Sequence, residues 1–381
     1  MKILLIISSL GPGGAERILT ILANNWVKFG NQVSICTFDS EKTKAFYKVD
    51  AQVNLIPLDC AASKSSFLKS LQNFITIPKK LRMLVKQLKP EIIISFMDQT
   101  NLLCLYSLRK TDIPLVVSER ISPAHSTLSN LLPDFIGRPL NSIARNFLYP
   151  YAHSIIVQTN EGKAQLPKKL KAKTLVIPNP VLIETEEATS HLLKKPCILA
   201  IGRLSKQKGF DRLIQAFATI SSRHPEWNLY IFGEGSDRTK LSELVNELNL
   251  EAKIFLPGLT KTPNNIMQQA DLFALSSRYE GFPGVLCEAL ANALPVLSND
   301  CPTGPKDIIA HQENGLLAKR EDFQDFVDKL ELLINQPELR QRLSSKAPEV
   351  LTDFSLDKIL ALWASVLFSF HSKDPAENNG L

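Results

Sequence analysis

Short apolar segments recur along this chain, and each is followed by a stretch whose apolar residues have helical spacing. The first series lies at residues 3–8, 32–37, 92–96, 115–118 and 155–158. The second lies at residues 198–201, 229–232, 254–256, 272–275 and 296–298. Strands that alternate with helices favour right-handed crossovers and parallel sheets covered on both faces. The two series therefore predict two α/β domains, each Rossmann-like.

The first series ends in a proline-rich and then acidic segment. Pro178 and Pro180 close it, and residues 184–187 are polar and acidic. A chain of 381 residues also exceeds the usual size of a single hydrophobic core. We predict a hinge at residues 180–195, an N-terminal domain at 1–182 completed by a helix at about 357–372, and a C-terminal domain at 183–356.

Composition describes an ordinary globular protein, with 44% apolar and 22% charged residues. The six cysteines are scattered without a C-x-x-C pair, so we interpret them as reduced core residues rather than zinc ligands or disulfides. The apolar N-terminus is too short to span a bilayer and reads better as a buried strand. We therefore expect a cytoplasmic protein, at most peripheral on the inner face of the cytoplasmic membrane.

The net charge of +6 is unevenly distributed. Residues 64–89 carry seven basic residues and no acid, with apolar residues interleaved at helical spacing. Such a segment can lie on an anionic membrane surface. It can equally be a solvated helix whose apolar side joins the core, and the sequence leaves both readings open. We do not expect a nucleic-acid partner, because aromatic residues for stacking and known nucleic-acid motifs are missing.

Two cations follow the apolar strand at residues 197–201. Arg203 and Lys208 lie on a turn flanked by Gly202 and Gly209, which permit a close approach of the backbone. Arginine offers a rigid fork for phosphate oxygens and lysine adds a compact charge. Spacing alone does not distinguish a phosphate-binding pair from two ordinary surface cations. The flanking glycines favour a site that binds a diphosphate.

Two carboxylates lie in and just after a Gly/Pro-rich loop. Glu280 is in the loop, and Glu288 is in the helix that we predict at residues 285–293. A carboxylate accepts two hydrogen bonds at once, which suits vicinal sugar hydroxyls. The helix is apolar nearly all round, so we expect Glu288 to be buried with a partner. Cations and carboxylates together indicate a sugar nucleotide.

Weaker motifs follow other strands. Residues 11–17 form a Gly-rich turn that opens a helix, a place where backbone N–H groups bind anions. This turn lacks the spacing of a dinucleotide fingerprint and of an ATP-binding phosphate loop. Three further loops, at residues 233–236, 257–259 and 301–307, should meet at one rim of the second sheet.

These segments together resemble the retaining family-4 glycosyltransferases of GT-B fold, in which two Rossmann-like domains face each other across a deep cleft. The resemblance rests on residues 11–17, 202–211, 233–235, 257–258 and 279–290 and covers nearly the whole chain. It implies an N-terminal acceptor domain, a C-terminal donor domain and a hexosyltransferase that needs no metal and no cofactor beyond its nucleotide diphosphate sugar, expected to carry UDP.

The resemblance also implies roles for single residues. Arg203 and Lys208 would bind the donor diphosphate, Glu288 the ribose hydroxyls and Glu280 the hydroxyls of the hexose. Further donor contacts are implied at Gly233, Gly235, Pro257 and Gly258, and, through backbone N–H groups, at Gly13, Gly14, Phe282, Pro283, Gly284 and Val285.

Residues 94–101 and 117–120 look most like enzymes of bacterial surface polysaccharides, including lipopolysaccharide. They are especially similar to lipid-linked oligosaccharide N-acetylgalactosaminyltransferases and amylovoran-type galactosyltransferases. The implied acceptor is a saccharide, linked to undecaprenyl diphosphate, with Glu16, Glu119, Arg120 and His125 as candidate contacts. Many relatives carry a histidine near residue 120, and here either Arg120 or His125 would take its part.

Two other functions stay open on the sequence. A sugar-nucleotide epimerase shares the fold but needs no acceptor. A non-catalytic binder of nucleotide sugars is the third reading, and the presence of Arg203, Lys208, Glu280 and Glu288 together argues against it.

Overall fold

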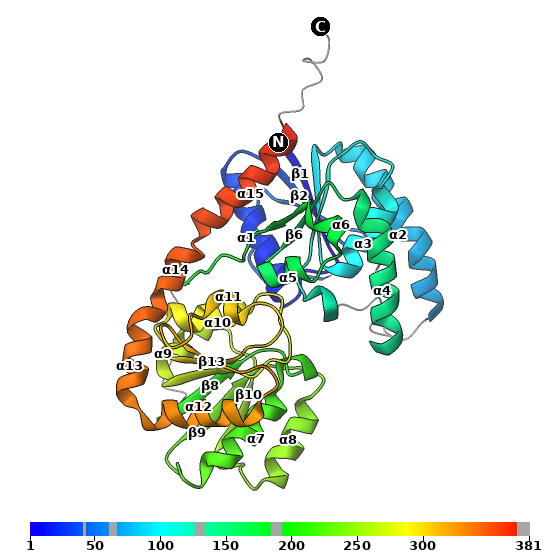
Figure 1. The fold of residues 1–381 in the computed structure, drawn as a ribbon. Helices are drawn as coiled ribbons and strands as arrows, with labels where there is room; N and C mark the ends of the chain where they lie inside the picture. The colour runs from blue at the N-terminus through cyan, green and yellow to red at the C-terminus, as the bar shows by residue number, and fades with distance from the viewer. Residues whose placement is uncertain (41–42, 61–66, 126–133, 184–192, 372–381) are drawn as a thin grey trace. The chain divides into compact units, whose positions relative to one another are not determined.

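The computed structural model describes residues 1–40, 43–60, 67–125, 134–183 and 193–371 (Figure 1). By their internal contacts these residues form two units. Unit 1 comprises Met1–Pro178 and the chain from Ile359, and unit 2 comprises Asn179–Lys358. Much of the hinge expected at residues 180–195 lies outside the described residues.

Unit 1 is built on a seven-stranded parallel sheet in the order β3-β2-β1-β4-β5-β6-β7. The strands are β1 (Lys2–Ile7), β2 (Gln32–Thr37), β3 (Asn54–Pro57), β4 (Ile92–Phe96), β5 (Leu115–Ser118), β6 (Ser154–Val157) and β7 (Thr174–Val176). Its helical segments are α1 (Gly14–Lys28), α2 (Phe67–Leu88), α3 (Asp98–Leu108), η1 (Pro123–His125), α4 (Asp134–Leu148), η2 (Tyr149–Tyr151), α5 (Asn160–Ala164), α6 (Lys168–Lys171) and α15 (Leu356–His371).

Helices cover both faces of this sheet because its strands are apolar on both sides. Leu4 and Ile6 of β1 belong to a core cluster with buried side chains of α2 and α3. Helices α1 and α15 lie together on the other side (Figure 1), where the rings of Trp26 and Trp363 meet at 5.9 Å. The C-terminal helix therefore completes unit 1.

Unit 2 has a six-stranded parallel sheet in the order β10-β9-β8-β11-β12-β13. Its strands are β8 (Cys197–Ile201), β9 (Asn228–Phe232), β10 (Ile254–Gly258), β11 (Leu272–Leu275), β12 (Val296–Asn299) and β13 (Leu316–Ala318). Its helical segments are η3 (Lys206–Lys208), α7 (Phe210–Ser221), α8 (Arg238–Glu247), α9 (Pro263–Gln269), α10 (Gly284–Ala291), α11 (Pro305–Ile308), α12 (Phe323–Asn335), α13 (Pro337–Lys346), η4 (Ala347–Glu349) and α14 (Val350–Asp353).

Unit 2 also has a core on each face of its sheet. One cluster joins buried side chains of α7, α8 and α12 to the strands, and the other joins those of α9, α10 and α14. The prediction of two parallel, Rossmann-like sheets is thus confirmed. All ten strands expected from apolar segments are present within two residues of the expected bounds, and β3, β7 and β13 were not foreseen.

The cysteines and the basic segment also have clear positions. All six cysteines are buried, and none of them forms a disulfide, as expected. Within the described residues, no helix combines the length and the apolar character needed to cross a bilayer. In the part of α2 whose side chains are described, Ile77, Leu81 and Leu84 are buried in the unit-1 core, while Lys79 and Lys86 are exposed. This part fits the reading in which the apolar side joins the core. Lys64 and the side chain of Lys69 lie outside the described residues.

Candidate active site

The loops after β8 and β9 and the end of β10 touch at the carboxyl edge of the unit-2 sheet. The N–H of Gly233 donates to the carbonyl oxygen of Gly258 over 2.8 Å. A Cβ at Gly233 would lie 1.8 Å from the Gly202 carbonyl oxygen, and one at Gly235 would lie 2.2 Å from that of Leu204. Glycine is therefore required at both positions for the loops to pack. Gly233 and Gly235 are therefore needed for the packing of these loops, whether or not a ligand binds there.

The loop after β11 is fastened to the turn after β8. The N–H of Arg278 donates to the Gln207 carbonyl oxygen over 2.7 Å, and Gln207 Nε2 donates to the Tyr279 carbonyl oxygen over 3.0 Å. The Ser276 hydroxyl donates to the Lys208 carbonyl oxygen over 3.0 Å. These bonds fix the backbone on both sides of the charged residues described next.

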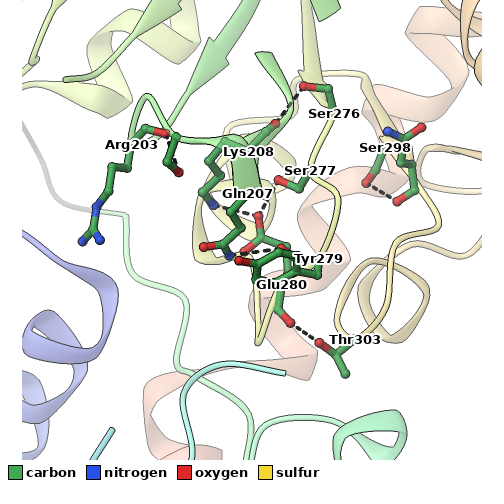
Figure 2. A network of polar contacts seen from close by, with 11 residues as sticks. Arg203, Gln207, Lys208, Ser276, Ser277, Tyr279, Glu280, Ser298 and Thr303 are labelled. Carbon is green, nitrogen blue, oxygen red and sulfur yellow. Dashed lines mark hydrogen bonds and ion pairs between the residues drawn. The ribbon is translucent and has the colours of Figure 1, made fainter. Parts of the chain in front are cut away.

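Lys208 and Glu280, separated by 72 positions, form an ion pair (Figure 2). Lys208 Nζ lies 2.7 Å from Glu280 Oε1, which also accepts a 2.5 Å hydrogen bond from the Ser277 hydroxyl. Glu280 is 4% exposed, and the Thr303 hydroxyl donates to its carbonyl oxygen. Lys208 and Ser277 offset the cost of burying this carboxylate. The sequence suggested a separate task for each residue and gave no sign that they would meet.

Arg203 is placed differently from Lys208. Its side chain is exposed and points away from the Lys208–Glu280 pair (Figure 2). Within the described part of the chain it makes no hydrogen bond or ion pair. The guanidinium therefore remains available to an anion in solution, whereas the ammonium of Lys208 is already shared with a carboxylate.

An ion pair that the sequence analysis missed clamps the same turn. Arg278 donates to Asp211 through two nitrogens, over 2.8 and 2.6 Å, and to the Lys206 carbonyl oxygen over 2.8 Å. Burial tends to raise the pKa of Asp211, but the hydrogen bonds and charge of Arg278 outweigh it and lower the pKa. Arg278, directly before Tyr279, is the residue from which the sequence could have indicated this ion pair.

Helix α10 departs from two expectations. It begins at Gly284 rather than Val285, and Glu288 is half-buried rather than buried. The apolar residues that suggested burial do face the core, as Leu286 and Leu290 show. Glu288 lies on the opposite side of the helix, which remains partly open to solvent.

The loop before α10 offers fewer N–H donors than expected. Pro283 has no N–H, and the N–H of Gly284 donates to the Phe282 carbonyl oxygen over 2.9 Å, which closes an inverse γ-turn. The expectation that N–H groups of all four residues from Phe282 to Val285 face a ligand is therefore wrong for Pro283 and Gly284.

Pro257 and Gly258 were expected in a loop but form the end of β10. The register of β10 against β9 shifts between Phe255 and Gly258, which is the mark of a β-bulge. Gly258 has a φ of 96°, a conformation that favours glycine. The bulge turns the strand end toward the loop that carries Gly233.

In unit 1, the Gly-rich turn after β1 ends at Gly13, and α1 begins at Gly14. The carboxylate of Glu16 folds back over Gly13. It is so close that a Cβ at Gly13 would lie 2.1 Å from Glu16 Oε2. An acidic group in this position suits the positive end of a helix. A diphosphate at the same N–H groups would require the Glu16 side chain to turn away.

Glu119, at the carboxyl end of β5, is turned into unit 1. It is 1% exposed, accepts a hydrogen bond from the Tyr149 hydroxyl and lies 3.6 Å from Arg145 Nε. Burial raises the pKa of Glu119, and Arg145 opposes that shift. Arg145 also donates to the Pro123 carbonyl oxygen over 3.0 Å. These contacts hold α4 against the turn at Pro123, which is a structural task that the sequence did not indicate.

Arg120 and His125 have unlike surroundings. The Arg120 guanidinium lies 4.4 Å from the centroid of the Phe96 ring, and burial lowers its pKa to about 9. His125 is half-exposed at the end of η1, and its Nδ1 lies 3.2 Å from the Ser122 hydroxyl. Ser122 in turn donates to Gln165 Oε1 over 2.8 Å. A chain of hydrogen bonds thus orients His125.

The described residues hold no cluster of three or more histidine, cysteine, aspartate or glutamate side chains that would suit a metal ion. Among them, the charged groups at the edge of the unit-2 sheet are organised by ion pairs and backbone bonds. Cations and carboxylates placed this way can bind an anion with a polyhydroxyl group attached.

Two family models match the chain. Residues 12–185 match Glycosyltransferase Family 4, and residues 183–350 match Glycosyl transferases group 1. Together with the fold, these matches define a glycosyltransferase with two Rossmann-like units.

Relatives of known activity match over nearly their whole length. An α-1,4-N-acetyl-D-galactosaminyltransferase of Campylobacter jejuni, whose substrate is a diphosphoundecaprenol-linked saccharide, is 30% identical over 96% of this chain and 98% of its own. The amylovoran biosynthesis glycosyltransferase AmsD of Erwinia amylovora is 25% identical over 96% of this chain and 99% of its own. The chain belongs to glycosyltransferase family 4, and the resemblance found in the sequence is confirmed.

Solved structures establish the same fold. The sucrose-phosphate synthase of Thermosynechococcus elongatus superposes with a TM-score of 0.85 at 16% identity, covering 98% of this chain and 100% of its own. Anabaena HepE in complex with UDP and glucose gives a TM-score of 0.73 at 19% identity, covering 97% and 100%. The fold is GT-B, and the enzyme is a glycosyltransferase that uses a nucleotide sugar.

Proposed function

We propose that this enzyme transfers a hexose or N-acetylhexosamine from a UDP-sugar to a lipid-linked saccharide, with retention at the anomeric carbon. The donor is supported by HepE, whose structure contains UDP and glucose. The acceptor is supported by the Campylobacter jejuni relative, whose substrate carries diphosphoundecaprenol. A role in surface polysaccharide or lipopolysaccharide synthesis, at the inner face of the cytoplasmic membrane, follows from such an acceptor.

The observation that carries the proposal is the Lys208–Glu280 pair beside the exposed Arg203. When the bond between the sugar and the diphosphate breaks, the diphosphate takes the electron pair and gains negative charge. Arg203 and Lys208 would stabilise that charge electrostatically, so no metal is required. The acceptor hydroxyl would form the new bond on the same face of the sugar, and its proton would pass to an oxygen of the departing diphosphate.

Glu280 and Glu288 would bind hydroxyl groups of the donor. Glu280 Oε1 already accepts hydrogen bonds from Lys208 and Ser277. A hexose hydroxyl that donates to this carboxylate would replace one of these donors or join them. Glu288 is half-buried on α10, so part of its side chain is in contact with solvent, and we propose it for the ribose hydroxyls. Of the loop donors proposed at residues 282–285, the N–H groups of Phe282 and Val285 remain.

For unit 1 we propose His125, rather than Arg120, as the residue that contacts the sugar. His125 is half-exposed and held by Ser122, whereas the Arg120 guanidinium is stacked on Phe96. Gly13, Gly14 and Glu16 stay candidates for diphosphate and acceptor contacts. Glu119 would not contact the acceptor itself. It would hold other residues of unit 1 in position through its contacts with Tyr149 and Arg145.

A donor screen tests the proposal. Purified protein is incubated with a panel of UDP- and GDP-sugars, with and without a bacterial lipid extract, and products are identified by mass spectrometry. We expect a lipid-linked saccharide to gain one sugar from a UDP donor, with UDP release that depends on the extract. A new epimer formed from donor alone would instead identify an epimerase. Donor binding without product in any mixture would identify a non-catalytic binder.

A further inference from the structure

The hydrogen bonds around His125 fix more than the orientation of its ring. Three groups of residues 122–125 take part, together with Gln165, which directly follows α5. Ser122 is 0% exposed, and His125 ends the short helix η1. A neutral imidazole carries one proton, on either Nδ1 or Nε2, and its hydrogen-bond partners decide which. The direction of each bond in this chain therefore sets the place of the proton.

The side-chain amide of Gln165 has one orientation that satisfies its neighbours. Its Oε1 lies 3.2 Å from the backbone nitrogen of Ala124, whose N–H can only donate. An amide nitrogen in the place of Oε1 would set two donors against each other, so the oxygen must face Ala124. The N–H of Gln165 itself donates to the Glu161 carbonyl oxygen over 3.0 Å, and Leu166 beside it is buried in the unit-1 core. The backbone that carries this amide is thus held in place.

This orientation commits the only hydrogen of the Ser122 hydroxyl. Gln165 Oε1 lies 2.8 Å from Ser122 Oγ and cannot donate, so the hydroxyl donates to it. The Ser122 oxygen then offers only lone pairs to Nδ1 of His125, which is 3.2 Å away. Nδ1 must therefore carry a proton to make this bond. In the neutral ring Nε2 is then the unprotonated nitrogen, which accepts hydrogen bonds and cannot donate them.

We propose that Gln165, acting through Ser122, is a positioning residue that holds neutral His125 in its Nδ1-protonated tautomer, so that Nε2 accepts a hydrogen bond from a hydroxyl of the bound sugar. The proposal rests on the contact of His125 with the sugar proposed above.

This tautomer narrows the chemistry that His125 can recognise to a group with an O–H. An ether oxygen has no hydrogen to donate, and a carboxylate would set its lone pairs against that of Nε2. The opposite tautomer would donate from Nε2 and would accept all three groups. Gln165 therefore acts on specificity through a proton, although it lies one residue further from the sugar than Ser122 in the chain of bonds.

Nuclear magnetic resonance of the full chain with 15N-labelled histidine tests the tautomer without any ligand. The chain has six histidines, and His125→Ala identifies the signals of His125 by their loss. In alkaline buffer the ring is neutral, and correlations from the ring protons distinguish a protonated nitrogen from an unprotonated one. We expect Nδ1 of wild-type His125 to carry the proton.

Two variants break the chain of bonds at different points. Gln165→Leu releases the Ser122 hydrogen, which can then turn toward the ring, and Ser122→Ala removes the acceptor of the Nδ1 proton. Each should convert a substantial share of His125 to the Nε2-protonated form, and the same spectra show whether the variant is folded.

Two further variants should keep the wild-type pattern. Gln165→Glu retains oxygen acceptors for both Ala124 and Ser122. Gln87→Leu makes the same change as Gln165→Leu at an exposed position of α2 and is the matched control.

Steady-state kinetics with the UDP-sugar found by the donor screen measures the effect on recognition. Gln165→Leu should raise the donor KM about three- to ten-fold with little change in kcat, because a hydrogen bond present before and during bond breaking is lost. Gln165→Glu should return KM to within about two-fold of wild type. In a panel of donors that each lack one sugar hydroxyl, one donor should bind more weakly to wild type and lose nothing further with His125→Ala.

A proton on Nε2 of wild-type His125 would overturn the proposal, and so would a tautomer that stays the same in both Gln165→Leu and Ser122→Ala. A tautomer that changes in Gln165→Leu without any rise in donor KM would overturn the recognition of a hydroxyl. Absence of transfer by wild type in the donor screen would contradict the proposed function. The tautomer is measured without ligand, so that failure is distinguished from failure of the hydrogen-bond assignment.

Discussion

The carboxyl edges of the two sheets carry charged residues that are used in opposite ways. At the unit-2 edge, Arg203 is exposed and the Lys208–Glu280 pair is held by loops that fold over one another. At the unit-1 edge, Glu119 is 1% exposed, and its Oε1 contacts Tyr149 and Arg145 of the same unit. The same edge of two similar sheets thus carries an exposed cation and a partly accessible ion pair in unit 2, and a buried carboxylate that helps to place a helix in unit 1.

The difference follows from the partners of each carboxylate. Glu280 is reached by a flexible lysine and a serine, which a ligand can replace or join. Glu119 is reached by a fully buried tyrosine, whose position is fixed by the core. A charged residue at the edge of a sheet therefore indicates a binding site when its partners can be exchanged, and a structural network when they cannot.

Substitution of the unit-2 cations should give the largest effect. Arg203→Ala and Lys208→Ala should each lower turnover roughly a hundred-fold or more, because removing one preorganised donor costs about 3–4 kcal/mol of transition-state stabilisation. Steady-state release of UDP measures this. Lys206→Ala removes an exposed lysine from the same turn and is the matched control.

The same two variants should differ in stability. Arg203→Ala should change the free energy of unfolding by less than about 0.5 kcal/mol, because the side chain is exposed. Lys208→Ala should lower it by about 2 kcal/mol, because the buried Glu280 loses a donor. Unchanged turnover in either variant would remove that residue from the proposed site.

In unit 1 the order of effects should be reversed. Tyr149→Phe removes the hydroxyl that donates to the buried Glu119, which should lower the free energy of unfolding by about 1–3 kcal/mol. Turnover per folded molecule should change less than about three-fold, within the effect expected of a residue remote from bond breaking. Chemical denaturation and UDP release measure the two quantities.

Glu119→Gln adds a test by pH. Burial raises the pKa of Glu119 above its ordinary 4.5 in the folded state. Since the folded state then holds the proton more tightly than the unfolded chain, stability falls as pH rises upward from about 4.5. The glutamine variant should lose this slope. A drop in turnover with stability intact would show that Glu119 contacts a substrate after all.

The sequence predicted most of this architecture because central parallel strands are apolar on both faces. The three strands it missed, β3, β7 and β13, are all at the edges of their sheets. Such strands are short and partly solvated, as Leu55 and Leu175, both 44% exposed, illustrate. Their apolar runs are therefore too weak to stand out from loops.

For the site, local motifs were readable and long-range partners were not. The glycines at 202, 209, 233 and 235 and the carboxylate at 280 stood in recognisable loops. The contact between Lys208 and Glu280 spans 72 positions, and that between Glu119 and Tyr149 spans 30. Each depends on how distant segments pack, so no nearby residue signals it.

The smallest effect should come from the clamp beside the unit-2 site. Asp211→Asn weakens the ion pair with Arg278, whose two bonds of 2.8 and 2.6 Å tie the turn after β8 to the loop after β11. Because Asp211 is 45% exposed, solvent screening limits the loss of stability to about 0.5–1 kcal/mol. Turnover should fall only a few-fold, since Lys208 stays in place through its own contacts with Glu280. Arg278 holds the pKa of Asp211 below its ordinary 3.8, so this stability is present above pH 3.8 and is lost as pH falls through the lower folded value. Wild type and variant should therefore differ in urea midpoint at neutral pH and converge under acid. A difference that grows with acidity would mean that the clamp does not depend on the charge of Asp211.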